Sequence, residues 1–221
     1  MTFMKTKHLA VLTVTGLLAV ASASAGIITI SSGTLDTPVP DGNPGGIYST
    51  MNVSGLGNLL GSGDNVSLTL NISGGNNGDL YAYLSFNGTL VTLLNRPGVT
   101  GGNPVGYTDA GFNNVTLSDG NSVNVNSYGG GGVPNSVSYN PAAGSTAFQA
   151  YNGMNTAGGW VLFIADMSGG DPSQSVLNSW SLSLDVVPEP VNVALGVFAV
   201  LLLAVAGLRR LRRSSRVTGK L

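Results

Sequence analysis

The sequence contains no cysteine, so it has no disulfide, no thiolate nucleophile and no thiolate metal site to draw on. Its one histidine, His8, lies in an N-terminal segment that we expect to be removed on export. The remaining chain then has no histidine, which excludes a Ser-His-Asp triad, a histidine general base and an ordinary zinc site. We therefore expect a protein that is not an enzyme.

Basic residues are almost missing from the central part of the chain. Between Gly26 and Val187 there are nine Asp, no Lys, no Glu and one Arg, Arg96, which gives this part a net charge of −8. An acidic body repels phosphate backbones, so we expect no nucleic-acid partner. Divalent cations or neutral glycans suit it better.

The N-terminus has the three parts of a secretory signal peptide. Lys5 and Lys7 precede an apolar run over residues 9–20, and Ala23 and Ala25 mark a small-residue cleavage site. A membrane anchor is the alternative, but the run is about 12 residues long where a span needs roughly 17 to 25. We predict that the export machinery takes up residues 1–25 and that signal peptidase cuts after Ala25.

A second apolar segment lies near the C-terminus. Residues 191–208 are uncharged and mostly apolar, and as a helix they would extend about 27 Å, enough to cross a bilayer. A buried helix of the globular domain is the alternative, but such a helix keeps a polar face, and this segment is apolar all round. Arginines follow at once, so we predict a transmembrane helix with the body outside the cytoplasm.

The segment around this span resembles the PEP-CTERM sorting signal of Gram-negative bacteria. Pro188-Glu189-Pro190 precedes the span, and an arginine cluster follows it: Arg209, Arg210, Arg212, Arg213 and Arg216. The resemblance assigns residues 188–221 to sorting. It implies cleavage near the Pro-Glu-Pro motif by an exosortase, followed by attachment to the cell surface or release, in a bacterium that makes extracellular polysaccharide.

The body between the two ends alternates apolar and polar residues in several short runs. Residues 66–72, 80–86 and 180–186 follow the period of two that half-buried strands show, and we find no convincing helical period in residues 26–187. Asn87-Gly88 predicts a tight hairpin turn that pairs residues 80–86 with the next strand. Residues 160–165 are continuously apolar, which indicates a central strand.

Turns rich in Gly, Asn, Asp and Ser separate these runs. The glycine run over residues 129–132 indicates a mobile loop, and it lacks the Lys-Ser/Thr that follows a phosphate-binding loop. We therefore predict one all-β domain over residues 26–187, a β-sandwich of about eight strands. Trp160 and Trp180 fall within the clearest strand patterns and are expected in its core.

The same body resembles the P domain, also called P/Homo B, of subtilisin-like proprotein convertases. The resemblance is carried by four stretches, namely residues 39–44 leading into 47–53, residues 78–80, residues 151–160, and Asp166 followed by residues 177–182. It implies a jelly-roll-like sandwich that stabilises or regulates a protease. Because the histidine of such a protease is missing, we do not expect peptidase activity here.

Several aspartates lie where strands begin or end. Asp79 opens one strand, and Asp166 and Asp171 bracket a short loop. If these loops meet at one end of the sandwich, the carboxylates form a Ca²⁺ site, with Asp41 and Asp109 as weaker additions. The alternative is that each Asp caps a turn by accepting bonds from nearby backbone N–H groups.

Seven tyrosines offer a second kind of site, a face on which a glycan would stack: Tyr48, Tyr81, Tyr83, Tyr107, Tyr128, Tyr139 and Tyr151. The leading hypothesis is an exported surface or exopolysaccharide-matrix protein with a binding or structural sandwich. The first alternative is an accessory P domain for a separate secreted protease. The second is a carboxylate-only hydrolase, which needs two carboxyl groups roughly 5 to 9.5 Å apart in a cleft.

Overall fold

The structure is a computed structural model that describes residues 26–54, 56–59, 66–187 and 196–206. The described residues between 26 and 187 belong to one compact unit, and residues 196–206, which belong to the other unit, are helical. No helix within the described residues is both long and apolar enough to span a membrane.

The residues predicted to direct export and sorting fall largely outside this description. The segment predicted to cross the membrane, 191–208, is described only over residues 196–206. The other sorting residues lie outside the described residues: Ala23, Ala25, Pro188, Glu189, Pro190, Arg209, Arg210, Arg212, Arg213 and Arg216.

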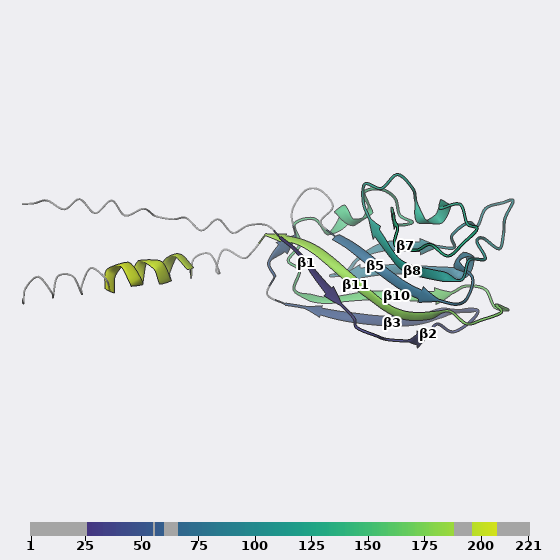
Figure 1. The fold of residues 1–221 in the computed structure, drawn as a ribbon, viewed down its shortest axis with the longest axis horizontal. Coiled ribbons are helices and arrows are strands. Elements are labelled where there is room, and N and C mark those ends of the chain that lie inside the picture. Colours follow the sequence, from purple (N-terminus) through teal and green to yellow (C-terminus); the bar gives the residue numbers. More distant parts are fainter. Residues whose placement is uncertain (1–25, 55, 60–65, 188–195, 207–221) are drawn as a thin grey trace, which may run out of the picture. The chain divides into compact units, whose positions relative to one another are not determined.

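The compact unit consists of two β-sheets that share one core (Figure 1). The first sheet has the order β1 (Gly26–Ser31), β11 (Val176–Val187), β5 (Val66–Ser73), β8 (Gly111–Ser118) and β9 (Ser138–Tyr139), and β2 (Thr37–Pro38) and β4 (Asn58–Leu59) pair with β11. The second has the order β3 (Asn43–Val53), β10 (Gly158–Asp166), β6 (Leu80–Phe86) and β7 (Thr89–Asn95). This confirms the predicted β-sandwich.

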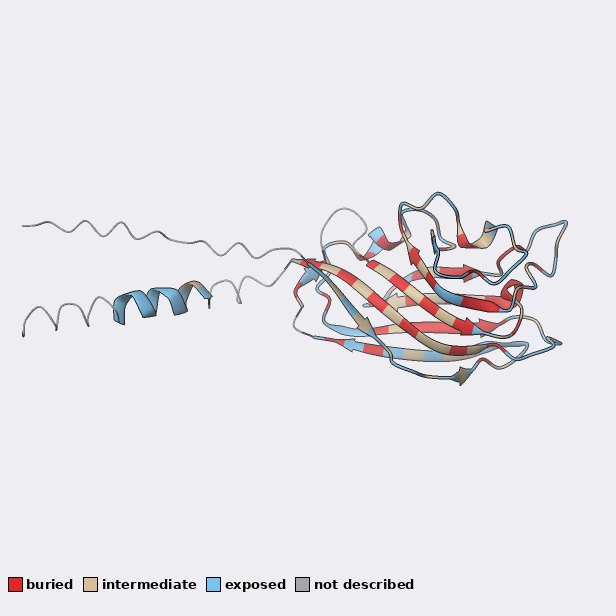
Figure 2. Cartoon of the chain, in the orientation of Figure 1, coloured by how far each residue is buried: buried red, intermediate tan, exposed pale blue. Residues whose placement is uncertain are grey.

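Alternation in the sequence becomes alternation of burial along each strand. Figure 2 shows buried and partly exposed residues succeeding one another along β11 and β5. In β6 the buried residues are Leu80, Ala82, Leu84 and Phe86, as the period of two predicts. The predicted hairpin is confirmed, because β6 and β7 pair antiparallel across Asn87-Gly88, where both residues have positive φ.

Both tryptophans are in the core, as predicted. Trp160 on β10 is fully buried against Phe86, with the ring centroids 3.9 Å apart, and its indole N–H donates to the Thr156 carbonyl at 3.1 Å. Trp180 on β11 reaches the other sheet, where its N–H donates to Ser49 Oγ at 2.9 Å. Each buried indole N–H is therefore paired.

Some details of the structure differ from the sequence expectation. Among the described residues of the body are three short 3₁₀ helices: η1 (Asn77–Asp79), η2 (Val125–Ser127) and η3 (Ala147–Tyr151). A single turn is too short to show a helical period. Strands β2, β4 and β9 have two residues each, so alternation cannot reveal them, and the remaining described strands number eight. Residues 129–132 are irregular, as expected of a loop.

Candidate metal centre at one end of the sandwich

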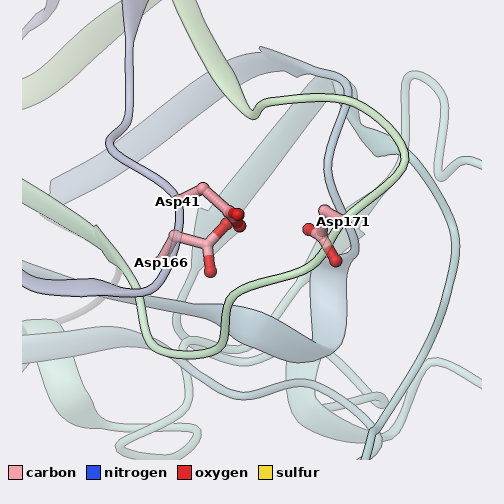
Figure 3. A group of neighbouring side chains, drawn as sticks. All are labelled: Asp41, Asp166 and Asp171. Atoms are coloured by element: carbon pink, nitrogen blue, oxygen red, sulfur yellow. The ribbon is translucent and has the colours of Figure 1, made fainter.

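Three carboxylates from separate segments converge where β10 ends. Asp41 lies in the loop before β3, Asp166 is the last residue of β10, and Asp171 lies in the loop between β10 and β11. One oxygen from each side chain lies within 4.8 Å of the others. Figure 3 shows the three carboxylates pointing toward one another. Asp166 and Asp171, two of the three main candidates from the sequence, thus lie together, and the third member of the group is Asp41, the weaker addition, rather than Asp79.

Glycines let the two loops approach closely. A Cβ on Gly42 would lie 3.0 Å from the Cα of Gly169, and Gly42 has φ +60°, a conformation that glycine adopts without strain. The Gly170 N–H donates to Asp41 Oδ2 at 3.0 Å, which ties the two loops together beside the carboxylates. The carboxylate positions therefore depend on a contact between backbones.

Asp166 is the buried member of the group, with 1% of its surface exposed. Its Oδ1 accepts the Ser168 N–H at 3.2 Å, while its Oδ2 is buried and has no hydrogen-bond partner. A buried carboxylate oxygen without a partner is costly, because nothing replaces the water that it has lost. Asp166 lies at the end of β10, next to a register shift between Ile164 and Asp166 in the pairing of β10 with β3.

Burial and neighbouring negative charges raise the pKa values of Asp166 and Asp79. Burial, with smaller effects from the charges of Asp171, Asp79 and Asp41, raises the pKa of Asp166 to about 6, although the Ser168 N–H acts in the opposite direction. Burial, followed by the charge of Asp171, also raises the pKa of Asp79. Both groups would be stabilised in the ionised form by a bound cation.

Asp79 has its own partners beside the group. It lies in η1, and its Oδ1 is 3.4 Å from Nη2 of Arg96, the one basic residue of the body. Asn76 links Asp79 to Asp171: its backbone N–H donates to Asp171 Oδ2 at 2.8 Å, and its side-chain amide donates to Asp171 Oδ1 and, at 3.5 Å, to Asp79 Oδ2. Asp79 therefore borders the three carboxylates, with Arg96 compensating part of its charge.

The donor set fits Ca²⁺ rather than a transition metal. Ca²⁺ binds oxygen at about 2.3 to 2.6 Å, so two oxygens that bind one ion lie at most about 5 Å apart. One oxygen from each of the three carboxylates meets this limit, since these oxygens lie within 4.8 Å of one another. Loop carbonyls and water supply further oxygens to reach a coordination number of about 6 to 8. The body offers no imidazole or thiolate, which zinc prefers.

The remaining candidates lie elsewhere. Asp109 accepts the Tyr128 hydroxyl at 2.7 Å and so fixes a loop. The seven tyrosines do not form one face. Tyr48, Tyr81 and Tyr83 surround Phe163 on the outer side of the four-stranded sheet; Tyr107, Tyr128 and Tyr139 form a second cluster; Tyr151 is buried.

Two contributors to the site had only weak signals in the sequence. Asp41 follows Pro40 and precedes Gly42, a turn sequence that suits capping as well as metal binding. Asn76 carries no signal that separates it from the other asparagines of the body. Its role depends on the approach of Asp171, which is 95 residues away in the sequence.

Comparisons with known proteins add little to this geometry. No family model matches the chain, and no curated protein matches it. Among solved structures, it is similar to part of the complex of the Aeromonas sobria serine protease with the chaperone ORF2, with 16% identity and a TM-score of 0.41 over 72% of this chain. The match covers 26% of that chain, about a quarter of its length, and we transfer no residue role from it.

Proposed function

We propose that the sandwich is a non-catalytic, calcium-stabilised binding or structural module of an exported protein of the cell surface or exopolysaccharide matrix. The observation that carries the calcium proposal is the convergence of Asp41, Asp166 and Asp171 around a buried Asp166 oxygen that has no partner. Turn capping explains the bonds to Ser168 and Gly170 but not this oxygen. A cation would satisfy it and would also relieve the repulsion among the three charges.

A melting experiment tests the calcium proposal. The purified protein is melted in excess chelator and then in millimolar Ca²⁺, and a ligand at a hundred times its dissociation constant stabilises the native state by about 2.7 kcal/mol. Asp171→Asn should remove the shift. Asp185→Asn, which removes the same charge from β11, is the matched control and should leave the shift in place. A wild-type melting temperature that does not respond to Ca²⁺ would refute the calcium proposal and leave turn capping as the role of these aspartates.

The non-catalytic part of the proposal is supported by the burial of Asp166, although Asp41 is exposed and Asp171 is half-buried. A hydrolase that uses two carboxyl groups needs both of them open to a substrate in a cleft. Asp166, the member with the most strongly raised pKa, is 1% exposed. A saturable hydrolytic activity in the purified protein, lost in Asp166→Asn, would overturn this part of the proposal.

Export and sorting rest on the sequence of the two ends. We propose that residues 1–25 are removed by signal peptidase and that residues 191–208 cross the membrane until an exosortase cleaves near Pro188-Glu189-Pro190. Intact-mass measurement of the surface fraction should find a chain that begins at Gly26 and ends near residue 190. Recovery of the full chain from the cytoplasmic fraction would refute the proposal.

A second candidate function is that of an accessory, jelly-roll-like P domain acting on a separate secreted protease. It is favoured because Asp41, Asp79 and Asp166, from three of the stretches that resemble this family, meet at one end of the sandwich. Affinity capture from the native surface fraction should then recover a subtilisin-like protease. Capture of polysaccharide without protease would favour the first proposal.

A further inference from the structure

The outer side of the seven-stranded sheet carries an ordered array of uncharged hydroxyl groups. Paired residues on neighbouring strands point to the same side, and two rows of such pairs cross β1, β11, β5 and β8. Every member is Ser or Thr: the rows are Thr29, Ser183, Ser67 and Ser118, and Ser31, Ser181, Thr69 and Thr116. We call these eight residues the hydroxyl rows.

Direct hydrogen bonds join neighbours within the rows. Thr29 and Ser183 hydroxyls are 2.8 Å apart, and those of Thr69 and Thr116 are 2.9 Å apart. Neighbouring strands lie about 4.8 Å apart, and successive rows lie about 7 Å apart along each strand. The array thus presents hydroxyl groups at regular intervals, and the two rows themselves contain no charged side chain.

The rows lead to a depression where two strand irregularities meet. Asn71 on β5 faces a register shift in its pairing with β11 and another in its pairing with β8. Its amide spans both, because Nδ2 donates to Ser179 Oγ at 3.1 Å and Oδ1 accepts the Asn114 N–H at 2.8 Å. Bulges of this kind re-aim side chains and occur often beside functional sites.

The depression has a volume of about 520 Å³, within the range of small-molecule sites. Its polar lining consists of Asn71, Ser73, Asn113, Asn178 and Ser179, and no charged side chain lines it. Asn113 donates through Nδ2 to Asn135, and Asn178 donates through Nδ2 to Asp36. The carbonyl oxygens of these two amides accept no hydrogen bond from a described residue, so they are available to a ligand.

We propose that this depression, continued by the hydroxyl rows, binds a neutral polysaccharide. Sugar hydroxyls both donate and accept, as do the amides and hydroxyls of this surface. An anionic polymer would meet a body with a charge of −8 whose one basic residue, Arg96, is already paired with Asp79. The inference rests on the proposed binding role of the sandwich but not on the calcium site.

Affinity electrophoresis of the purified protein tests the proposal, in gels that contain dextran, laminarin or galactomannan, with alginate as the anionic comparison. We expect at least one neutral polymer to retard the wild type, and alginate to have no effect. Asn113→Ala and Asn178→Ala should each weaken the retardation about fivefold to tenfold, since each removes a hydrogen-bonding amide. Asn52→Ala, at an exposed asparagine of β3 in the other sheet, should behave as the wild type.

Melting each variant separates lost binding from lost folding. Asn113 is exposed, so its replacement leaves the fold intact and decides the test even if Asn178→Ala is unstable. Retardation that survives in Asn113→Ala would overturn the location of the site while leaving the sandwich a binding module. An absence of retardation in all three neutral polymers would overturn the inference, whereas the calcium proposal is decided separately by the response of the wild-type melting temperature.

Discussion

Replacing Asp166 by Asn should stabilise the metal-free protein and abolish its response to calcium. Burial raises the pKa of Asp166 from 3.8 to about 6, so an ionised carboxylate at pH 7.5 costs about 3 kcal/mol relative to the unfolded chain. Asn has nearly the same shape and no charge, but it leaves a buried N–H without a partner, which costs about 1 to 3 kcal/mol. The net gain of up to about 2 kcal/mol corresponds to a rise of up to about 8 °C in the melting temperature.

Calcium should reverse the order of stability, because the Asn variant lacks the buried ligand. Urea unfolding at pH 7.5, in chelator and in millimolar Ca²⁺, measures both effects. Asp185→Asn removes a charge from β11, away from the three converging carboxylates, and should change the unfolding free energy by less than about 0.5 kcal/mol in either condition. Our reasoning fails if Asp166→Asn destabilises the chelated protein, or if the variant keeps the stabilisation by calcium.

Three further outcomes follow from the structure. Because the folded protein holds the proton of Asp166 more tightly than the unfolded chain does, the stability that this proton gives is present below about pH 4 and lost as the pH rises through about 6. In chelator, the urea midpoint should therefore fall between these pH values. With saturating Ca²⁺ the midpoint should fall less, or rise. Ser49→Ala leaves the buried Trp180 N–H without an acceptor and should lower the free energy of unfolding, measured in urea, by about 1 to 3 kcal/mol. Ser85→Ala, on the outer side of β6, should leave that free energy nearly unchanged. Gly42→Ala should weaken calcium binding in titration calorimetry by separating the two loops, whereas Gly33→Ala, with similar φ but open space around it, should not.

The sequence predicts those parts of the fold that a local period governs. Residues 80–86 alternate without interruption, and the structure places strand β6 at the same bounds. Irregular strand pairing has no pattern in the local sequence, because the register shifts around Asn71 depend on which residues of β8 and β11 lie opposite it. The depression at these shifts was therefore invisible in the sequence, where its asparagines look like turn residues.

The carboxylate group also combines a feature that the local sequence predicts with one that only the tertiary structure determines. Asp166 and Asp171 are close in sequence, so a shared loop can be inferred from their spacing. The choice between Asp41 and Asp79 as their nearest companion depends on how the strands cross, and the structure places Asp41 in the group while Asp79 pairs with Arg96. The tyrosines illustrate the opposite case: the period of two in residues 80–86 places Tyr81 and Tyr83 on the side away from the core, but the seven tyrosines do not form a single face.

The scarcity of basic residues gives the carboxylate group its significance. In most proteins a buried carboxylate is paired with a Lys or Arg side chain, because the positive charge offsets the loss of hydration. Here residues 26–187 contain one basic side chain, Arg96, and it forms its ion pair with Asp79. Asp166, whose pKa burial raises to about 6, must then either take up a proton or obtain a positive charge from solvent. If the protein is exported and binds Ca²⁺, as we propose, the ion would supply this charge, and the stability of the domain would then depend on a component that the chain itself does not provide.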